Sequence, residues 1–257
     1  MSTMKNLQIP SDASRLPVTL PALAEKKRLG EPIVMVTAYD HPSARAAEAA
    51  GVDLVLVGDR PFGSYEVSDE QAVQTAFRFV KEAGCDAVKL EGGGPASVAR
   101  ANAIVQAGIP VMGHVGLTPQ TSTALGGYKA QGRSAHGAMK VANEALALQD
   151  AGCFSIVFEA IPSALAAEVM PHMHIPVIGI GAGPATDGQV LVFHDLLGIR
   201  EGLGARFVKR YANLQDEMNA GVAAYAADVR SRAYPQPGHG YSIDEAELAA
   251  FREAFAR

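Results

Sequence analysis

Five polar or ionisable side chains stand where short apolar runs of this sequence end: Asp59, Lys89, Glu91, His114 and Glu159. If each run is a strand of a parallel sheet, these side chains converge on one rim, where such folds keep their chemistry. Three carboxylates with no cysteine or second histidine suit a hard cation such as Mg²⁺, which takes one or two protein carboxylates and leaves positions for substrate oxygens. The pattern favours a metal-assisted reaction on a small molecule.

Each of these residues also has an ordinary structural explanation. A single acid at a strand end often caps the next helix, and His114 taken alone fits a hydrogen-bonded strand-end histidine. Lys89 leaves the same face of its strand as Glu91, two residues later. It either pairs with that acid or binds a substrate carboxylate, and the adjacent expected metal site favours substrate binding.

The elements that must position these residues repeat a simple form. A glycine ends a helix, an apolar run of strand length follows, and a polar side chain comes next. Strands are expected at 33–38, 54–58, 87–91, 109–113, 154–159, 176–181 and 207–208, and helices at 22–28, 42–50, 68–83, 96–107, 137–151, 163–170, 187–197 and 214–232. The last of these helices is expected to close the core. The alternation predicts an α/β fold, a (β/α) barrel rather than an open doubly wound sheet, with seven strands detectable and one βα unit missing.

Length and composition fit one barrel domain spanning residues 1–257. Residues 1–17 are expected to form a loose lead-in and residues 235–257 a peripheral tail, while the long loop 114–133 is expected to serve the site. A net charge of −5 does not indicate binding to nucleic acid or to an anionic membrane. With no apolar run of membrane-spanning length and no secretory leader, we expect a cytoplasmic protein. Its two cysteines, Cys85 and Cys153, are expected to be small buried residues.

Several motifs are similar to those of the ketopantoate hydroxymethyltransferase family, whose members belong to the phosphoenolpyruvate/pyruvate group of barrels. Among them are VKLEGG at 88–93, GHVGLTPQ at 113–120 and GGYKAQGR at 126–133. Further matching blocks lie at 36–40, 56–59, 61–65, 158–162, 178–183, 187–192 and 194–195. The resemblance runs from about Val18 to Pro237.

The resemblance implies a (β/α)8 TIM-type barrel that binds Mg²⁺ and 2-oxo-3-methylbutanoate. It implies transfer of a one-carbon unit from 5,10-methylenetetrahydrofolate through a Mg-stabilised enolate, as a step of pantothenate biosynthesis. By the same resemblance Glu159 is the catalytic base, Asp59, Lys89 and His114 bind substrate, and Asp59 and Glu91 belong to the metal site. The family also implies a homo-oligomer.

The chain departs from the family pattern at Asp59. The sequence before this residue resembles the block around one family aspartate, and the sequence after it resembles the block that follows the next aspartate, so one βα unit is absent. Arg60 stands where the family has a serine that helps to hold the substrate. A barrel closes only when strand number and stagger agree. The chain must therefore close with seven strands, borrow a strand or leave a gap, and we predict weakened metal binding with reduced or absent activity.

Two other functions stay open at the level of sequence. One is a non-catalytic homologue that serves as an oligomeric subunit or scaffold, which the missing aspartate favours and the retained Glu159 disfavours. The other is a metal-dependent carbon–carbon lyase or mutase of the same barrel group, which the retained loop at 126–129 disfavours.

Overall fold

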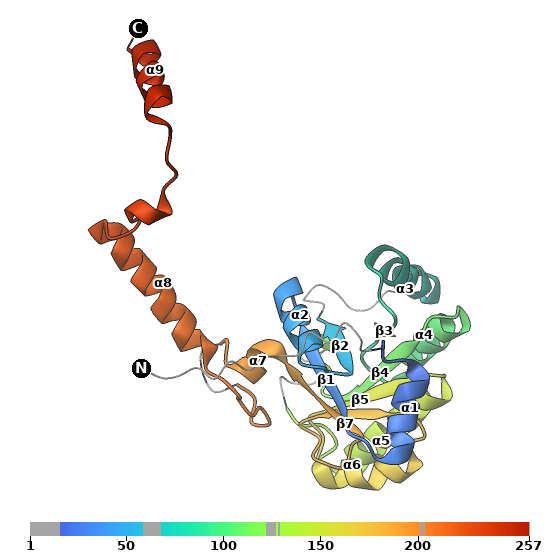
Figure 1. Ribbon diagram of the computed structural model, residues 1–257. Coiled ribbons are helices and arrows are strands. Elements are labelled where there is room, and N and C mark those ends of the chain that lie inside the picture. The colour runs from blue at the N-terminus through green and yellow to red at the C-terminus, as the bar shows by residue number, and fades with distance from the viewer. Residues whose placement is uncertain are drawn as a thin grey trace.

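Seven parallel strands form one curled sheet, with helices on its outer side (Figure 1). The computed structural model describes residues 16–58, 68–121, 127, 129–200, 202 and 204–256. The strand order is β2-β1-β7-β6-β5-β4-β3. The strands are β1 (Ile33–Ala38), β2 (Leu54–Val57), β3 (Val88–Lys89), β4 (Val111–Gly116), β5 (Ser155–Glu159), β6 (Val177–Ile180) and β7 (Gly188–Val192). The predicted α/β barrel architecture with seven strands is confirmed.

Several helices begin or end where the sequence supplies a cap. The helices are α1 (Leu20–Leu29), α2 (His41–Ala49), α3 (Asp69–Ala83), α4 (Pro95–Gln106), α5 (Ala135–Asp150), α6 (Ser163–Val169), α7 (Phe193–Leu197), α8 (Leu214–Ser231) and α9 (Glu245–Phe255). The Ser68 hydroxyl accepts from the Gln71 amide at the start of α3, and Gly84 ends that helix in the left-handed conformation at φ 71°. Such caps fix where the chain turns into the next strand.

Two apolar clusters hold the barrel together. The larger fills the layer between the sheet and helices α3 to α6, around residues such as Leu148 and Phe158. The smaller fills the inside of the curled sheet, where Leu23 of α1 packs with Met35, Met112 and Ile178. Burying such side chains contributes roughly 1.5–3 kcal/mol each, so both faces of the central strands are fixed. Their carboxyl ends are therefore held at one rim.

The sheet is open between β2 and β3. β2 pairs with β1 and β3 pairs with β4, so these two strands form the ends of the described sheet. The outward side chains of β2 confirm the opening, since Val55 is 38% exposed and Val57 is 66% exposed. Of the three possibilities that the sequence leaves for a shortened barrel, the described residues of the single chain show the gap.

Two elements differ from the sequence prediction around the seventh strand. Residues 187–197 form β7 followed by the short helix α7, rather than one helix. Gly188 allows this because its backbone lies against β1, where a Cβ atom would come within 2.3 Å of the Ile33 carbonyl oxygen. Residues 207–208, expected as a strand, lie in a turn region. Phe207 instead packs against Gly181 at the rim.

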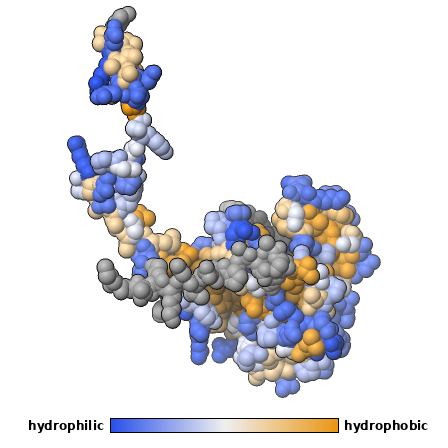
Figure 2. Space-filling view, in the orientation of Figure 1, coloured by the Kyte–Doolittle hydropathy of each residue, from blue (hydrophilic) through white to orange (hydrophobic). Residues whose placement is uncertain are grey.

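Helix α8 does not close the core as predicted. It projects from the barrel with α9 beyond it (Figure 1), and none of its residues is buried. Hydrophobic residues recur along its exposed surface (Figure 2), among them Met218, Val222, Tyr225 and Val229. Their spacing places them on one side of the helix. The sequence correctly predicted a helix here but not its position.

No helix within the described ranges combines the length and hydrophobicity needed to span a membrane.

Candidate active site

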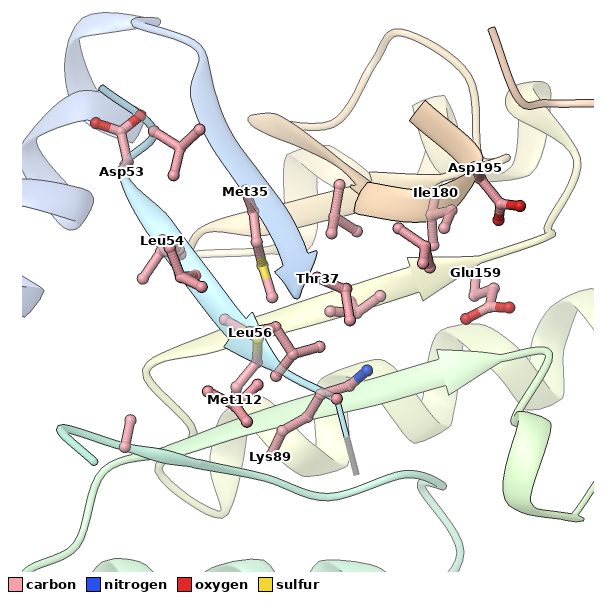
Figure 3. A pocket seen from close by; sticks show the side chains of 18 of the residues that line it. Met35, Thr37, Asp53, Leu54, Leu56, Lys89, Met112, Glu159, Ile180 and Asp195 are labelled. Carbon is pink, nitrogen blue, oxygen red and sulfur yellow. The ribbon is translucent and has the colours of Figure 1, made fainter. Parts of the chain in front are cut away.

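Lys89, Glu91 and Glu159 line a single cavity inside the curled sheet. Lys89 lies in β3, Glu91 follows that strand, and Glu159 ends β5. The Lys89 and Glu159 side chains enter the cavity from different strands (Figure 3). Because β3 and β5 flank β4 in parallel, their carboxyl ends reach the same rim. The predicted convergence of these three residues is confirmed as geometry.

Glu91 is held by the chain that follows β4. Its Oε2 accepts a hydrogen bond of 3.1 Å from the Gln120 amide, and its Oε1 lies 3.8 Å from Nδ1 of His114. The Gly92 amide donates to the His114 carbonyl oxygen at 2.8 Å, which ties the turn after β3 to β4. With a side chain only 10% exposed, Glu91 has few rotamers open to it.

Glu159 is positioned by hydrogen bonds on both sides of β5. The Leu117 amide donates to the Glu159 carbonyl oxygen at 2.8 Å, and the Ala160 amide donates to the Ile180 carbonyl oxygen at 2.8 Å. Ala160 has φ 49°, a left-handed conformation that a residue with a Cβ adopts only at a cost. This turn lies at the cavity, because Ala160 and the next three residues also line it.

The described end of the long loop touches this turn. The Gln131 amide donates to the Ala160 carbonyl oxygen at 2.9 Å, and Ala130 and Arg133 line the cavity. This placement agrees with a loop that serves the site. Residues 122–126 and 128, which carry much of the predicted glycine-rich motif, lie outside the described residues.

His114 lies within β4, not after it, because the pairing of β4 with β5 continues to Gly116 and Glu159. The imidazole is therefore fully buried, with Nε2 3.2 Å from Oε2 of Glu159. Within the described residues neither ring nitrogen makes a hydrogen bond of good geometry. His114 lies behind the two acids and is not among the residues that line the cavity. Its substrate-binding role stays a prediction.

Burial sets the charges of Glu159 and His114. It raises the pKa of Glu159 to about 7, although the positive charge of Lys89 acts in the opposite direction. Burial also lowers the pKa of His114 to about 3, helped by Lys89 and opposed by Glu91 and a backbone contact with Leu117. His114 is neutral at pH 7, so its contact with Glu159 joins a neutral ring to a titrating carboxyl group. A carboxyl group with a pKa near 7 suits a general base.

Metal binding depends partly on a residue that the structure does not describe. Asp59, predicted to bind both metal and substrate, lies outside the described residues, as does Arg60. Within the described ranges, no three acidic, histidine or cysteine side chains converge as a metal-binding group. Glu91 supplies a carboxylate with the oxygen chemistry that a hard cation prefers, and Glu159 and Asp195 add further carboxyl groups to the same cavity.

Some residues of the cavity were not singled out from the sequence. Thr37, at the end of β1, is a polar side chain only 7% exposed that lies among apolar cavity residues (Figure 3). In the sequence, the sign that could have identified this residue was a polar threonine inside the apolar run at 33–38. Asp195 also reaches the cavity and pairs with Arg200 at 2.7 Å.

The two cysteines are free. Cys153 is buried, which raises the pKa of its thiol to about 11, and Cys85 is partly buried. Neither belongs to the group around Glu159.

A family model described as "Ketopantoate hydroxymethyltransferase" matches residues 17–60 and 59–237 of this chain. The chain belongs to the ketopantoate hydroxymethyltransferase family. An Arabidopsis thaliana relative named "3-methyl-2-oxobutanoate hydroxymethyltransferase 1, mitochondrial" is 43% identical over 279 residues, covering 91% of this chain and 80% of the relative. A Moorella thermoacetica relative named "3-methyl-2-oxobutanoate hydroxymethyltransferase" is 44% identical over 268 residues, covering 89% and 99%. The family expected from the motifs is confirmed.

The family match divides into two stretches that meet at residues 59–60, the point where the motif pattern also breaks. The alignment with the Arabidopsis relative spans 279 positions but uses 91% of 257 residues, about 234, so about 45 positions have no counterpart in this chain.

A solved structure described as a putative phosphonomutase from Burkholderia cenocepacia J2315 has the same fold. Its TM-score is 0.51 at 15% sequence identity, over 68% of this chain and 92% of that structure. The likeness supports the predicted barrel class and carries no information on the reaction.

Proposed function

We propose that this chain transfers a hydroxymethyl group to 3-methyl-2-oxobutanoate, giving 2-dehydropantoate, and that it does so at the cavity lined by Lys89, Glu91 and Glu159. The names of the relatives support the reaction class. The observation that carries the proposal is the pairing of a cation with a buried carboxyl group whose pKa is about 7 in one cavity. Removal of a proton next to a carbonyl group needs such a base.

Glu159 removes the proton from C3 of the 2-oxo acid. Burial keeps its pKa near the working pH, so a substantial share of the molecules holds the carboxylate that accepts the proton. The hydrogen bonds that fix the backbone on both sides of Glu159 hold the carboxyl group in place. The C3 electron pair then forms the new bond to the one-carbon unit. Both bonds from that carbon to the folate nitrogens break, water supplies the hydroxyl group, and tetrahydrofolate leaves.

Lys89 binds the carboxylate of the 2-oxo acid. Its side chain comes from β3 into the same cavity, and its positive charge acts on Glu159. A cation on one wall and a base on another orient the substrate between them. The apolar residues Met35, Leu56 and Met112 line the cavity nearby and suit the branched hydrocarbon end of the acid.

Mg²⁺ and 5,10-methylenetetrahydrofolate are part of the proposal as cofactor and one-carbon donor. Glu91 would hold the cation, because Mg²⁺ is commonly bound through one or two carboxylates together with substrate oxygens. When bound, Mg²⁺ would polarise the 2-oxo group and make the C3 proton more acidic. Asp59 would be a second ligand if it reaches the rim.

The missing βα unit is proposed to weaken this site. The break in the family match, the shortfall of about 45 aligned positions and the gap between β2 and β3 all support a unit lost at one place. The strand end beside Glu91 and Lys89 that would carry a second acid is then absent. We expect weaker Mg²⁺ binding and slower turnover than in the relatives.

A homo-oligomer and a cytoplasmic location are also proposed. The exposed hydrophobic residues Met218, Val222, Tyr225 and Val229 of α8 support association, because single exposed apolar residues are common but a row of them along one helix is not. The cytoplasmic location has only the sequence expectation behind it.

A transfer assay tests the proposal. The protein is incubated with 3-methyl-2-oxobutanoate, 5,10-methylenetetrahydrofolate and a series of Mg²⁺ concentrations, with the Moorella thermoacetica relative as the positive reference. We expect 2-dehydropantoate to form more slowly than with the relative and to require more Mg²⁺. Formation at equal rates in the protein and in Glu159→Gln would contradict the role of Glu159.

A non-catalytic subunit is the second candidate, and the gap in the sheet favours it. An active site that lacks one strand of its barrel loses part of the wall that orients the substrate. No product at any Mg²⁺ concentration, from a folded protein that assembles with its own copies, would support this second function.

A further inference from the structure

On each side of the gap between β2 and β3 lies a strand that forms an end of the described sheet. β2 and β3 run parallel within one sheet, each forms one of its ends, and one cavity is lined by both. Seven strands leave one position vacant in an eight-stranded barrel. A strand end without a neighbour presents backbone groups that can pair with another chain.

Apolar side chains lie beside the gap on both the inner and the outer face of the sheet. Leu54 and Leu56 of β2 pack with the inner cluster, while Val55 and Val57 of the same strand point outward and are exposed. Across the gap Phe79 of α3 is 44% exposed and lines the same cavity. In parallel barrels a helix covers outward side chains of this kind. A strand with apolar side chains would face the inner residues, and an apolar helix face would cover the outer ones.

The number of unmatched family positions fits that vacancy. About 45 positions of the Arabidopsis alignment have no counterpart here, and one strand with its crossover helix takes about 30 residues or more. The break in the family match falls directly after β2.

We propose that this gap is a docking site for a separate strand–helix polypeptide. Its strand has about five apolar residues, pairs in parallel with β2 on one edge and with β3 on the other, and its amphipathic helix covers Val55, Val57 and Phe79. The inference concerns partner binding and does not depend on the proposed hydroxymethyl transfer.

A separate strand–helix polypeptide fits the gap better than a second copy of the chain does, because two strand edges, those of β2 and β3, need a partner at once. A strand that fills the gap needs both of its edges free. The sheet-end strands that a second copy could offer from its described residues are β2 and β3, and each already pairs on one side. A copy could cover one wall at a time, whereas a separate strand covers both.

The test uses the full chain and a defined probe. The probe is the fluorescently labelled segment, about 40 residues long, of the Moorella thermoacetica relative that corresponds to the family positions skipped at residues 59–60. Fluorescence anisotropy measures its binding, and hydrogen exchange locates the contact. We expect saturable one-to-one binding, with slower amide exchange in β2 and in residues 87–90.

Two matched changes separate docking from non-specific adhesion. Val57→Glu places a charge at the gap, and Met139→Glu places the same charge on α5, where the methionine is 60% exposed against 66% for Val57. We expect Val57→Glu to weaken binding at least tenfold and Met139→Glu to leave it unchanged. A proline in the middle of the probe strand removes a backbone donor and should abolish binding.

Three results would overturn the proposal. The first is no saturable binding, and the second is equal weakening by both glutamate variants. The third is slow exchange, before the probe is added, at those β2 amides that do not pair with β1, which would mean that another segment or a second copy already fills the gap. None of these measurements involves the 2-oxo acid, Mg²⁺ or folate, so failure of docking and failure of the transferase proposal are told apart.

Discussion

Nε2 of His114 lies 3.2 Å from Oε2 of Glu159, so a fully buried neutral imidazole stands behind the carboxyl group at the end of β5. Glu91 lies on the other side of the same ring, with its Oε1 3.8 Å from Nδ1. One buried side chain of β4 therefore contacts the two acids that come from the strands on either side. This arrangement fixes the spacing of the acids at the rim.

The raised pKa of Glu159 predicts a pH-dependent cost in stability. Its folded-state pKa of about 7 lies above the ordinary value of 4.5, so its contribution is fully present below about pH 4.5 and is lost as pH rises through about 7. Glu159→Gln should therefore match the protein at pH 4.5 and exceed its free energy of unfolding at pH 8, by on the order of 2–3 kcal/mol. Urea unfolding at both pH values measures this. An equal difference at the two pH values would show that the carboxyl group is not desolvated.

Lys89→Met should shift the pH dependence of proton removal. The positive charge of Lys89 lowers the pKa of Glu159 against the effect of burial, so its removal should raise that pKa further. We expect the midpoint of the pH profile for C3 proton exchange to move upward and the affinity for 2-oxo acid to fall. The variant Lys140→Met, at an exposed lysine of α5, serves as the control. If the midpoint does not move in Lys89→Met, the charge of Lys89 does not act on the pKa of the base, which would contradict this prediction.

The left-handed turn at Ala160 predicts an unequal response to substitution. At φ 49°, a β-branched side chain is strained, so Ala160→Val should cost about 1–2 kcal/mol of stability. Ala160→Gly fits this conformation and should change stability by less than about 1 kcal/mol. Thermal unfolding of both variants provides the comparison. Equal losses would mean that packing, and not backbone conformation, governs this position.

Magnesium binding tests the proposed loss of a ligand-bearing strand. In isothermal titration with 3-methyl-2-oxobutanoate present, we expect Mg²⁺ to bind this chain at least tenfold more weakly than it binds the Moorella thermoacetica relative. Glu91→Gln should weaken it further, because Glu91 is the carboxylate proposed to hold the cation. Affinity equal to that of the relative would refute the proposed weakening.

The fold was largely predictable because its strands are uninterrupted apolar runs between glycine-ended helices. β5 is an example, since Ser155 to Phe158 are buried on both faces as the run predicts. β7 was missed because an aspartate and a glycine before Val190 resemble a helix start, whereas Asp187 in fact accepts from the Val177 amide and pairs with Lys27. The contact that decides this element is non-local, and sequence periodicity does not contain it.

The meeting of three site residues in one cavity was predictable, but the depth at which His114 lies was not. Strand ends indicated that Lys89, Glu91 and Glu159 would meet, because parallel strands share one rim. His114 was placed after its strand, while the β4–β5 pairing continues past it and buries it. The position of α8 could not be predicted from the sequence either, since the pattern of apolar residues in a helix does not say which surface the helix covers.

The most direct test of the central claim is deuterium exchange at C3 of 3-methyl-2-oxobutanoate in D₂O, followed by NMR with Mg²⁺ present and folate absent. The claim is that Glu159 serves as the base in the cavity that it shares with Lys89. We predict exchange above the rate without protein, rising with pH through about 7, and its loss in Glu159→Gln. Exchange that is equally fast in the protein and in Glu159→Gln would contradict the account.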